Sequence, residues 1–120
     1  MKTLFESRLN SFHFALNGLF ATLRTQSNIW VQTPIGVLVV LAGLYFNISR
    51  AEWLILVLTI AGVLTAELIN TSIEVTLNYL AKEHHLDVKA AKDIAAGAVL
   101  VSCIASVVIG LLIFLPYIFS

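Results

Sequence analysis

The chain has 120 residues, of which 59% are hydrophobic and 12% are charged, and its mean hydropathy is +0.94. Soluble domains usually carry about a quarter charged residues, so this composition excludes an ordinary soluble domain and favours a protein embedded in a bilayer. Seven basic and seven acidic residues cancel, and without a basic excess we expect no nucleic-acid partner. The length predicts a single domain over residues 1–120.

Residues 4–24 have the pattern of an amphipathic helix. Apolar side chains recur there at steps of three and four residues: Phe5, Leu9, Phe12, Leu16, Leu19 and Leu23. Polar side chains fall largely on the opposite side. We therefore predict a helix that lies in the membrane interface or covers a helical bundle.

Three apolar stretches follow, separated by polar residues. A polar break at residues 25–33, with Pro34 in the first turn of the next helix, introduces a first span at about 30–48, anchored at the interface by Trp30. A polar turn at 47–52 precedes a second span at about 53–80. An exposed charged loop at 81–93 precedes a third span at about 92–118, expected to end near Pro116. The predicted fold class is an all-α membrane protein with an N-terminal surface helix and three transmembrane helices.

The basic residues predict an orientation for these spans. With three spans, the N-terminus and the loop at residues 81–93 lie on the same side of the membrane. That side carries all basic residues except Arg50: Lys2, Arg8, Arg24, Lys82, Lys89 and Lys92. Because basic residues are enriched on the cytoplasmic side, we expect a multi-pass protein of the cytoplasmic membrane with both of these segments in the cytoplasm.

The most informative stretch is residues 66–74, near the end of the second span. After Trp53 the first charged residue is Glu67, and Asn70 and Glu74 follow it at spacings of three and four. On a helix these three share one stripe, with the two carboxylates roughly 20° apart. Glu67 would lie about 21 Å beyond Trp53, still within a hydrocarbon core of about 30 Å, and Glu74 about 10 Å further on. Carboxylates at such depth are costly, which favours a functional site.

A site that passes from hydrocarbon to cytosol can join a lipid-borne group to a water-soluble one. Glu67, removed from water, suits a general base for a hydroxyl. Glu74, at the wet end, suits a ligand of Mg²⁺, which usually takes one or two protein carboxylates together with substrate phosphates. Lys92 would neutralise phosphate charge. The pattern predicts phosphoryl transfer from a nucleotide to a lipid alcohol, without a Walker loop or a kinase Gly-rich loop.

Two segments resemble the signature of the prokaryotic diacylglycerol kinase and undecaprenol kinase family. They are the pattern E-x-x-N-x-x-x-E at residues 67–74 and the tripeptide A-K-D at residues 91–93. The resemblance extends over nearly the whole chain. The run A-A-G-A at residues 95–98 and the segment 47–53 resemble the undecaprenol kinase branch more than the diacylglycerol kinase branch.

The resemblance implies a homotrimeric integral-membrane kinase whose active sites are shared between protomers. Such a kinase moves the γ-phosphate of ATP, with Mg²⁺, onto the hydroxyl of a long-chain lipid alcohol. The resemblance matches Glu67 to the family's catalytic base, Asn70 to the asparagine that lies beside that base, and Glu74 to a metal ligand. Nucleotide contact is expected for six residues: Glu74, Glu83, His85, Lys92, Asp93 and, in the N-terminal helix, Phe14.

Three positions depart from the family's usual pattern. Gln26 stands where a second metal-binding Glu is usual, Gln32 where an acidic residue or His is usual, and Asn78 where an Asp is usual. A Gln can coordinate a metal through its carbonyl oxygen but brings no charge, so Gln26 is kept as a candidate metal ligand. Two interpretations stay open: a functional variant with weaker metal affinity or another phosphate donor, and a diverged member with reduced or no kinase activity.

Two further classes of function also stay open. In a small proton-coupled transporter, Glu67 would bind protons or cations. In a structural subunit, the polar residues would only hold helices together. The acceptor lipid is open as well: the branch resemblance favours undecaprenol over diacylglycerol, but an apolar lining accepts any long chain.

Overall fold

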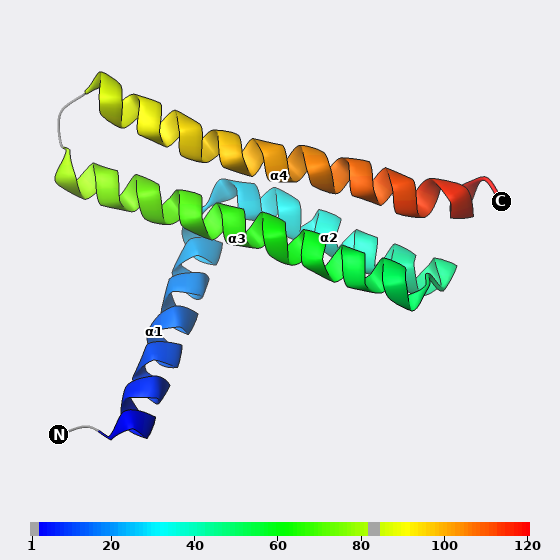
Figure 1. The fold of residues 1–120 in the computed structure, drawn as a ribbon, viewed down its shortest axis with the longest axis horizontal. Coiled ribbons are helices and arrows are strands. Elements are labelled where there is room, and N and C mark those ends of the chain that lie inside the picture. Colours follow the sequence, from blue (N-terminus) through cyan, green and yellow to red (C-terminus); the bar gives the residue numbers. More distant parts are fainter. Residues whose placement is uncertain (1–2, 82–84) are drawn as a thin grey trace. The chain divides into compact units, whose positions relative to one another are not determined.

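A computed structural model of the chain describes residues 3–81 and 85–120. All regular structure in these residues is helical: α1 (Leu4–Thr25), α2 (Ser27–Phe46), α3 (Arg50–Leu80) and α4 (Leu86–Ile118) (Figure 1). The chain forms two compact units, Met1–Thr33 and Pro34–Ser120, and the boundary between them falls inside α2. The N-terminal helix predicted at residues 4–24 is confirmed as α1, while its location at a membrane surface stays a prediction.

Two helices begin with reciprocal caps that the sequence specifies. The backbone N–H of Glu6 donates to the Thr3 hydroxyl at 3.1 Å, and the backbone N–H of Thr3 donates to the Glu6 carboxylate at 3.2 Å. Ser49 and Glu52 repeat this arrangement at 3.2 and 3.0 Å. Each pair satisfies two backbone N–H groups that a helix start leaves open. The second pair starts α3 earlier than expected, so the turn predicted at residues 47–52 is shorter in the structure.

Both prolines lie inside helices, where the sequence predicted a helix start and a helix end. α2 is helical from Ser27 onward and passes through Pro34, so the polar break predicted at residues 25–33 is wrong and shrinks to Gln26. α4 likewise continues past Pro116. A proline removes one backbone hydrogen bond from a helix. Membrane helices tolerate this loss because neighbouring groups satisfy the freed carbonyl.

The exposed loop predicted at residues 81–93 is also mostly helical, because α4 begins at Leu86. Local charges favour this earlier start. Asp87 lies in the first turn, where a negative charge is stabilised by the helix dipole. Lys89 and Asp93 are four residues apart and form an ion pair of 2.7 Å on the helix surface.

Three helical segments are long and apolar enough to cross a membrane: Asn28–Phe46, Arg50–Leu80 and Leu86–Ile118. The prediction of three apolar helices that could span a membrane is therefore confirmed. Several hydroxyl groups within them bond to their own helix; the Thr59 hydroxyl, for example, donates to the Ile55 carbonyl at 2.7 Å. Such local bonds suit a bilayer, where water cannot satisfy polar groups.

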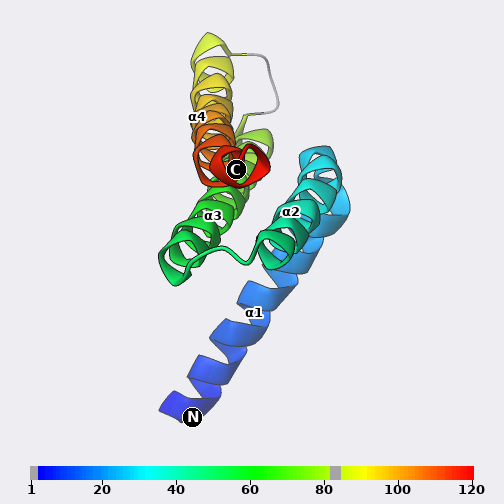
Figure 2. The ribbon, with the colours of Figure 1, turned by 90° about the vertical axis from the view of Figure 1, so that its right-hand side faces the viewer.

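In the unit Pro34–Ser120, α3 and α4 lie side by side and run antiparallel (Figures 1 and 2). At one end the last turns of α2 approach the start of α3 closely. A Cβ added at Gly43 would lie 2.8 Å from Cη2 of Trp53, so glycine permits this approach. Asn47, with φ of 53°, makes the turn between the two helices, a conformation that asparagine tolerates well.

An apolar cluster fills this end of the unit. Its buried members are Ile48, Leu56 and Ile113. Partly buried residues that pack around them are Val39, Phe46, Trp53, Ile109, Phe114 and Tyr117. The apolar cluster thus lies at the N-terminal end of α3, and the polar stripe that begins at Glu67 lies nearer its C-terminal end.

Candidate active site

The stripe on α3 passes from a buried end to an exposed end. Glu67 is fully buried, with 0% of its surface exposed, and Asn70 is 7% exposed. Glu74 is half-buried and Asn78 is exposed. Measured from Arg50, Glu67 lies about 26 Å along the helix and Glu74 about 36 Å, which straddles the end of a hydrocarbon core of about 30 Å. The burial therefore agrees with a dry carboxyl and a wetter carboxylate on one helix face.

Hydrogen bonds connect the stripe residues along the helix. The Asn70 amide, through Nδ2, donates to Oε1 of Glu74 at 3.5 Å, a long and weak bond. Thr71, buried beside them, donates its hydroxyl to the backbone carbonyl of Glu67 at 2.9 Å. The side-chain oxygen Oδ1 of Asn70 is buried and accepts no hydrogen bond within residues 3–81 and 85–120. A buried acceptor without a donor costs about 1–3 kcal/mol, so a bound group that donates a hydrogen bond to it would be favoured.

Two lysines at the start of α4 take different partners. Lys92 donates from Nζ to Oδ1 of Asn78, which joins the start of α4 to the last turns of α3. Lys89 pairs with Asp93 at 2.7 Å, and both side chains are more than half exposed. Asp93 lies in the second turn of α4 and is therefore not a helix cap. The structure brings Lys92, but not Asp93, into contact with the stripe residues.

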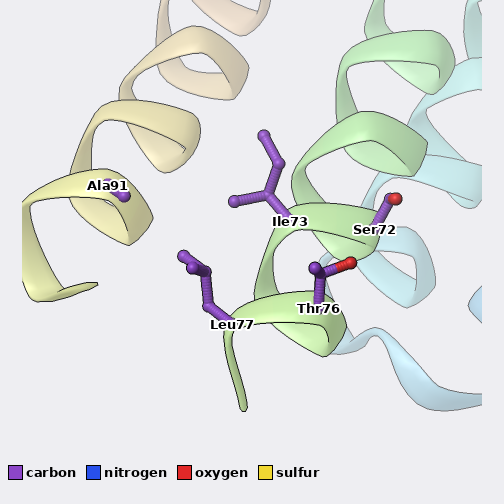
Figure 3. A pocket seen from close by; sticks show the side chains of 5 residues that line it. All are labelled: Ser72, Ile73, Thr76, Leu77 and Ala91. Atoms are coloured by element: carbon purple, nitrogen blue, oxygen red, sulfur yellow. The ribbon is translucent and has the colours of Figure 1, made fainter. Parts of the chain in front are cut away.

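A shallow pocket of 240 Å³ lies near the same end of α3 and α4, lined by Ser72, Ile73, Thr76, Leu77 and Ala91 (Figure 3). In Figure 3, Ile73 and Leu77 extend from α3 on the side where Ala91 of α4 lies. Ser72 and Thr76 are roughly 140° and 180° around the helix from Glu67. The pocket is therefore not built by the stripe, and its lining carries no charge that would hold a phosphate.

The remaining predicted site residues lie elsewhere in the chain. His85 is exposed and precedes the first residue of α4, and its side chain makes no capping hydrogen bond. Glu83 lies outside the described residues. Phe14 is 70% exposed and Gln26 is half-buried, and both belong to the unit Met1–Thr33. The backbone N–H of Gln26 closes α1 on the carbonyl of Thr22 at 3.0 Å.

The donor set on α3 suits a metal ion that arrives with phosphates. Among the described residues, no group of three or more His, Cys, Asp or Glu side chains could hold a metal ion. Glu74, half-buried and within 3.5 Å of the Asn70 amide, offers one carboxylate at the exposed end of the stripe. Mg²⁺ usually needs only one or two protein carboxylates when substrate phosphates complete its shell. The residues present therefore fit Mg²⁺ bound with a nucleotide better than a metal held by this chain alone.

The sequence did not single out two features of this unit. Thr71 is 8% exposed, and its hydroxyl donates to the backbone carbonyl of Glu67. Its position next to Asn70 in the sequence could have indicated that it belongs to the site. Tyr117 donates its hydroxyl to Glu52, joining the end of α4 to the start of α3. These two residues are 65 positions apart, so no local pattern indicates the contact.

Comparison with known proteins identifies the family. A family model described as prokaryotic diacylglycerol kinase matches residues 13–114. The chain is 43% identical over 106 residues to an undecaprenol kinase of Bacillus subtilis, covering 88% of this chain and 86% of that protein. It is 35% identical over 113 residues to a diacylglycerol kinase of Synechocystis sp., covering 93% of this chain and 65% of that protein. These matches confirm the resemblance found in the sequence, and the chain belongs to the prokaryotic diacylglycerol kinase family of membrane lipid kinases.

Proposed function

We propose that this lipid kinase transfers the γ-phosphate of ATP to the hydroxyl of a membrane lipid, and that undecaprenol is a better acceptor than diacylglycerol. The observation that carries the proposal is the burial of Glu67 on a helix face that ends in the exposed contact between Asn78 and Lys92. In this proposal the lipid hydroxyl approaches the buried end from the bilayer, and the nucleotide approaches the exposed end from water. The higher identity to the undecaprenol kinase, of the two relatives compared, supports the choice of acceptor.

The proposed reaction begins with the lipid hydroxyl at the buried end of the stripe. The hydroxyl donates its single proton to Glu67, which acts as general base, and Asn70 beside it orients the base or the hydroxyl oxygen. The hydroxyl oxygen forms a bond to the γ-phosphorus of ATP while the bond to the β–γ bridging oxygen breaks, and ADP leaves. Lys92 would stabilise the negative charge on the transferred group.

Glu74 is the proposed metal ligand. Mg²⁺ bound there with ATP would neutralise charge on the phosphate oxygens. Gln26 remains a candidate second ligand through its carbonyl oxygen, and Glu83, His85, Asp93 and Phe14 remain candidate nucleotide contacts. If Gln26 is a ligand, Gln26→Glu would restore an acidic ligand and lower the Mg²⁺ concentration needed for half-maximal transfer.

We further propose that the chain acts as a homotrimer with shared sites in the cytoplasmic membrane, with its N-terminus and the start of α4 in the cytoplasm. The single carboxylate at Glu74 supports this assembly, since a neighbouring protomer would supply ligands that the described part of one chain lacks. The mass of the protein in detergent, corrected for bound detergent, tests the trimer. A monomeric mass in an active preparation would refute it.

The deciding experiment is transfer of labelled phosphate from ATP to lipid by the purified protein in mixed micelles. Undecaprenol and diacylglycerol are offered separately with Mg²⁺, and Glu67→Gln is the control. Transfer to undecaprenol in excess of diacylglycerol, lost in the control, is the expected result. Absence of transfer to both lipids by an assembled, folded protein would refute the kinase reaction and favour a diverged member.

A further inference from the structure

The side chains of Lys92 and Asn78 form a contact between α4 and α3. It joins two helices across 14 positions of sequence, with Lys92 half-buried and Asn78 exposed. Asn78 stands one turn beyond Glu74, and its direction around α3 differs from that of Glu67 by roughly 20°. The contact therefore holds the Lys92 ammonium over the face of α3 that carries the stripe.

Of the two lysines at the start of α4, only Lys89 is paired with a carboxylate in the described structure. Asp93 pairs with Lys89, one turn earlier on α4, so that carboxylate offsets the charge of Lys89. Lys92 bonds instead to an amide oxygen, which accepts a hydrogen bond but brings no charge. An acceptor of this kind fixes the position of the ammonium and leaves its positive charge available to an incoming anion.

We propose that Asn78 is a positioning residue for Lys92, holding its ammonium where the nucleotide phosphates bind; this inference rests on the proposed function. Lysine has a flexible four-carbon stem and loses considerable rotamer freedom when its end is fixed. If Asn78 fixes Lys92 before the nucleotide binds, the loss of side-chain entropy has already occurred and does not weaken nucleotide binding. Removal of the acceptor should therefore weaken the nucleotide complex by about three- to tenfold, the size expected for the net contribution of one ordinary hydrogen bond.

The test uses the full-length protein in mixed micelles and measures KM for ATP, KM for the lipid and kcat. Asn78→Ala removes the acceptor, and Asn78→Leu does so while keeping a similar side-chain volume. Asn78→Gln keeps a neutral amide oxygen as acceptor, and the exposed position has room for the longer side chain. Tyr79→Phe is the matched control, because Tyr79 is the adjacent residue and is 80% exposed.

We expect Asn78→Ala and Asn78→Leu to raise KM for ATP by about three- to tenfold and to leave KM for the lipid within about twofold. Asn78→Gln should keep KM for ATP to within about twofold of the natural protein, and Tyr79→Phe should not change it. In a Lys92→Ala background, Asn78→Ala should have no further effect, since the residue it positions is gone.

Three results would overturn the inference: an unchanged KM for ATP in both Asn78→Ala and Asn78→Leu, an Asn78→Gln variant as impaired as Asn78→Ala, or equal increases in both KM values. The last result would mean that the contact only stabilises the packing of α3 against α4. Each of these results requires that the natural protein transfers phosphate. Loss of transfer in the natural protein itself would instead refute the proposed function.

Discussion

The substitution Glu67→Gln separates a catalytic role of the buried carboxyl from a structural one. Glutamine has nearly the same size and shape, so the substitution opens no cavity at a position with 0% exposure. It removes a group whose charged form is costly to bury, so the free energy of unfolding should stay the same or rise. It also removes the proposed base, which should lower kcat by about 10²- to 10⁴-fold. At 1.36 kcal/mol for each tenfold change, this equals about 3–5 kcal/mol of barrier.

The assay pairs phosphate transfer with thermal unfolding, both in the same micelles. The matched control is Glu52→Gln, which removes a carboxylate from the same helix at its opposite end, where Tyr117 bonds to it. We expect this control to keep kcat within about twofold, because it lies far along α3 from the stripe. If Glu67→Gln instead keeps kcat within tenfold of the natural protein, or loses activity only in proportion to lost stability, the base assignment is wrong and the residue is a helix contact.

Three more outcomes follow from contacts in the unit Pro34–Ser120. Tyr117→Phe should lower the unfolding temperature and leave phosphate transfer unchanged, since it removes the hydroxyl bonded to Glu52. The control Tyr45→Phe, at a residue that is 83% exposed, should change neither. Equal unfolding temperatures for the two variants would contradict this prediction. Glu74→Gln should raise the Mg²⁺ concentration for half-maximal transfer by about tenfold or more, and a Mg²⁺ titration that matches the natural protein would exclude Glu74 as a ligand. Lys89→Ala should change stability and KM for ATP little, because its pair with Asp93 is exposed; a large rise in KM for ATP would show that this pair serves the nucleotide.

The main features of the fold were predictable because they depend on local pattern and on the bilayer. Long apolar stretches predict spans through composition alone, and the three candidate spans are confirmed. The stripe of Glu67, Asn70 and Glu74 was predictable because helical period places residues three and four apart on one face. The helix ends were predicted less well: both Pro34 and Pro116 lie inside helices, since a membrane helix can tolerate a proline that a sequence rule treats as a boundary.

What only the tertiary structure decided is which groups meet across helices. The sequence by itself determined a membrane-embedded helical chain with a carboxylate stripe and a basic segment before the last span. The structure paired Lys92 with Asn78 and Tyr117 with Glu52, and left Asp93 with Lys89. The first two contacts depend on how α3 and α4 pack as antiparallel neighbours, and the period of a single helix carries no information about that packing.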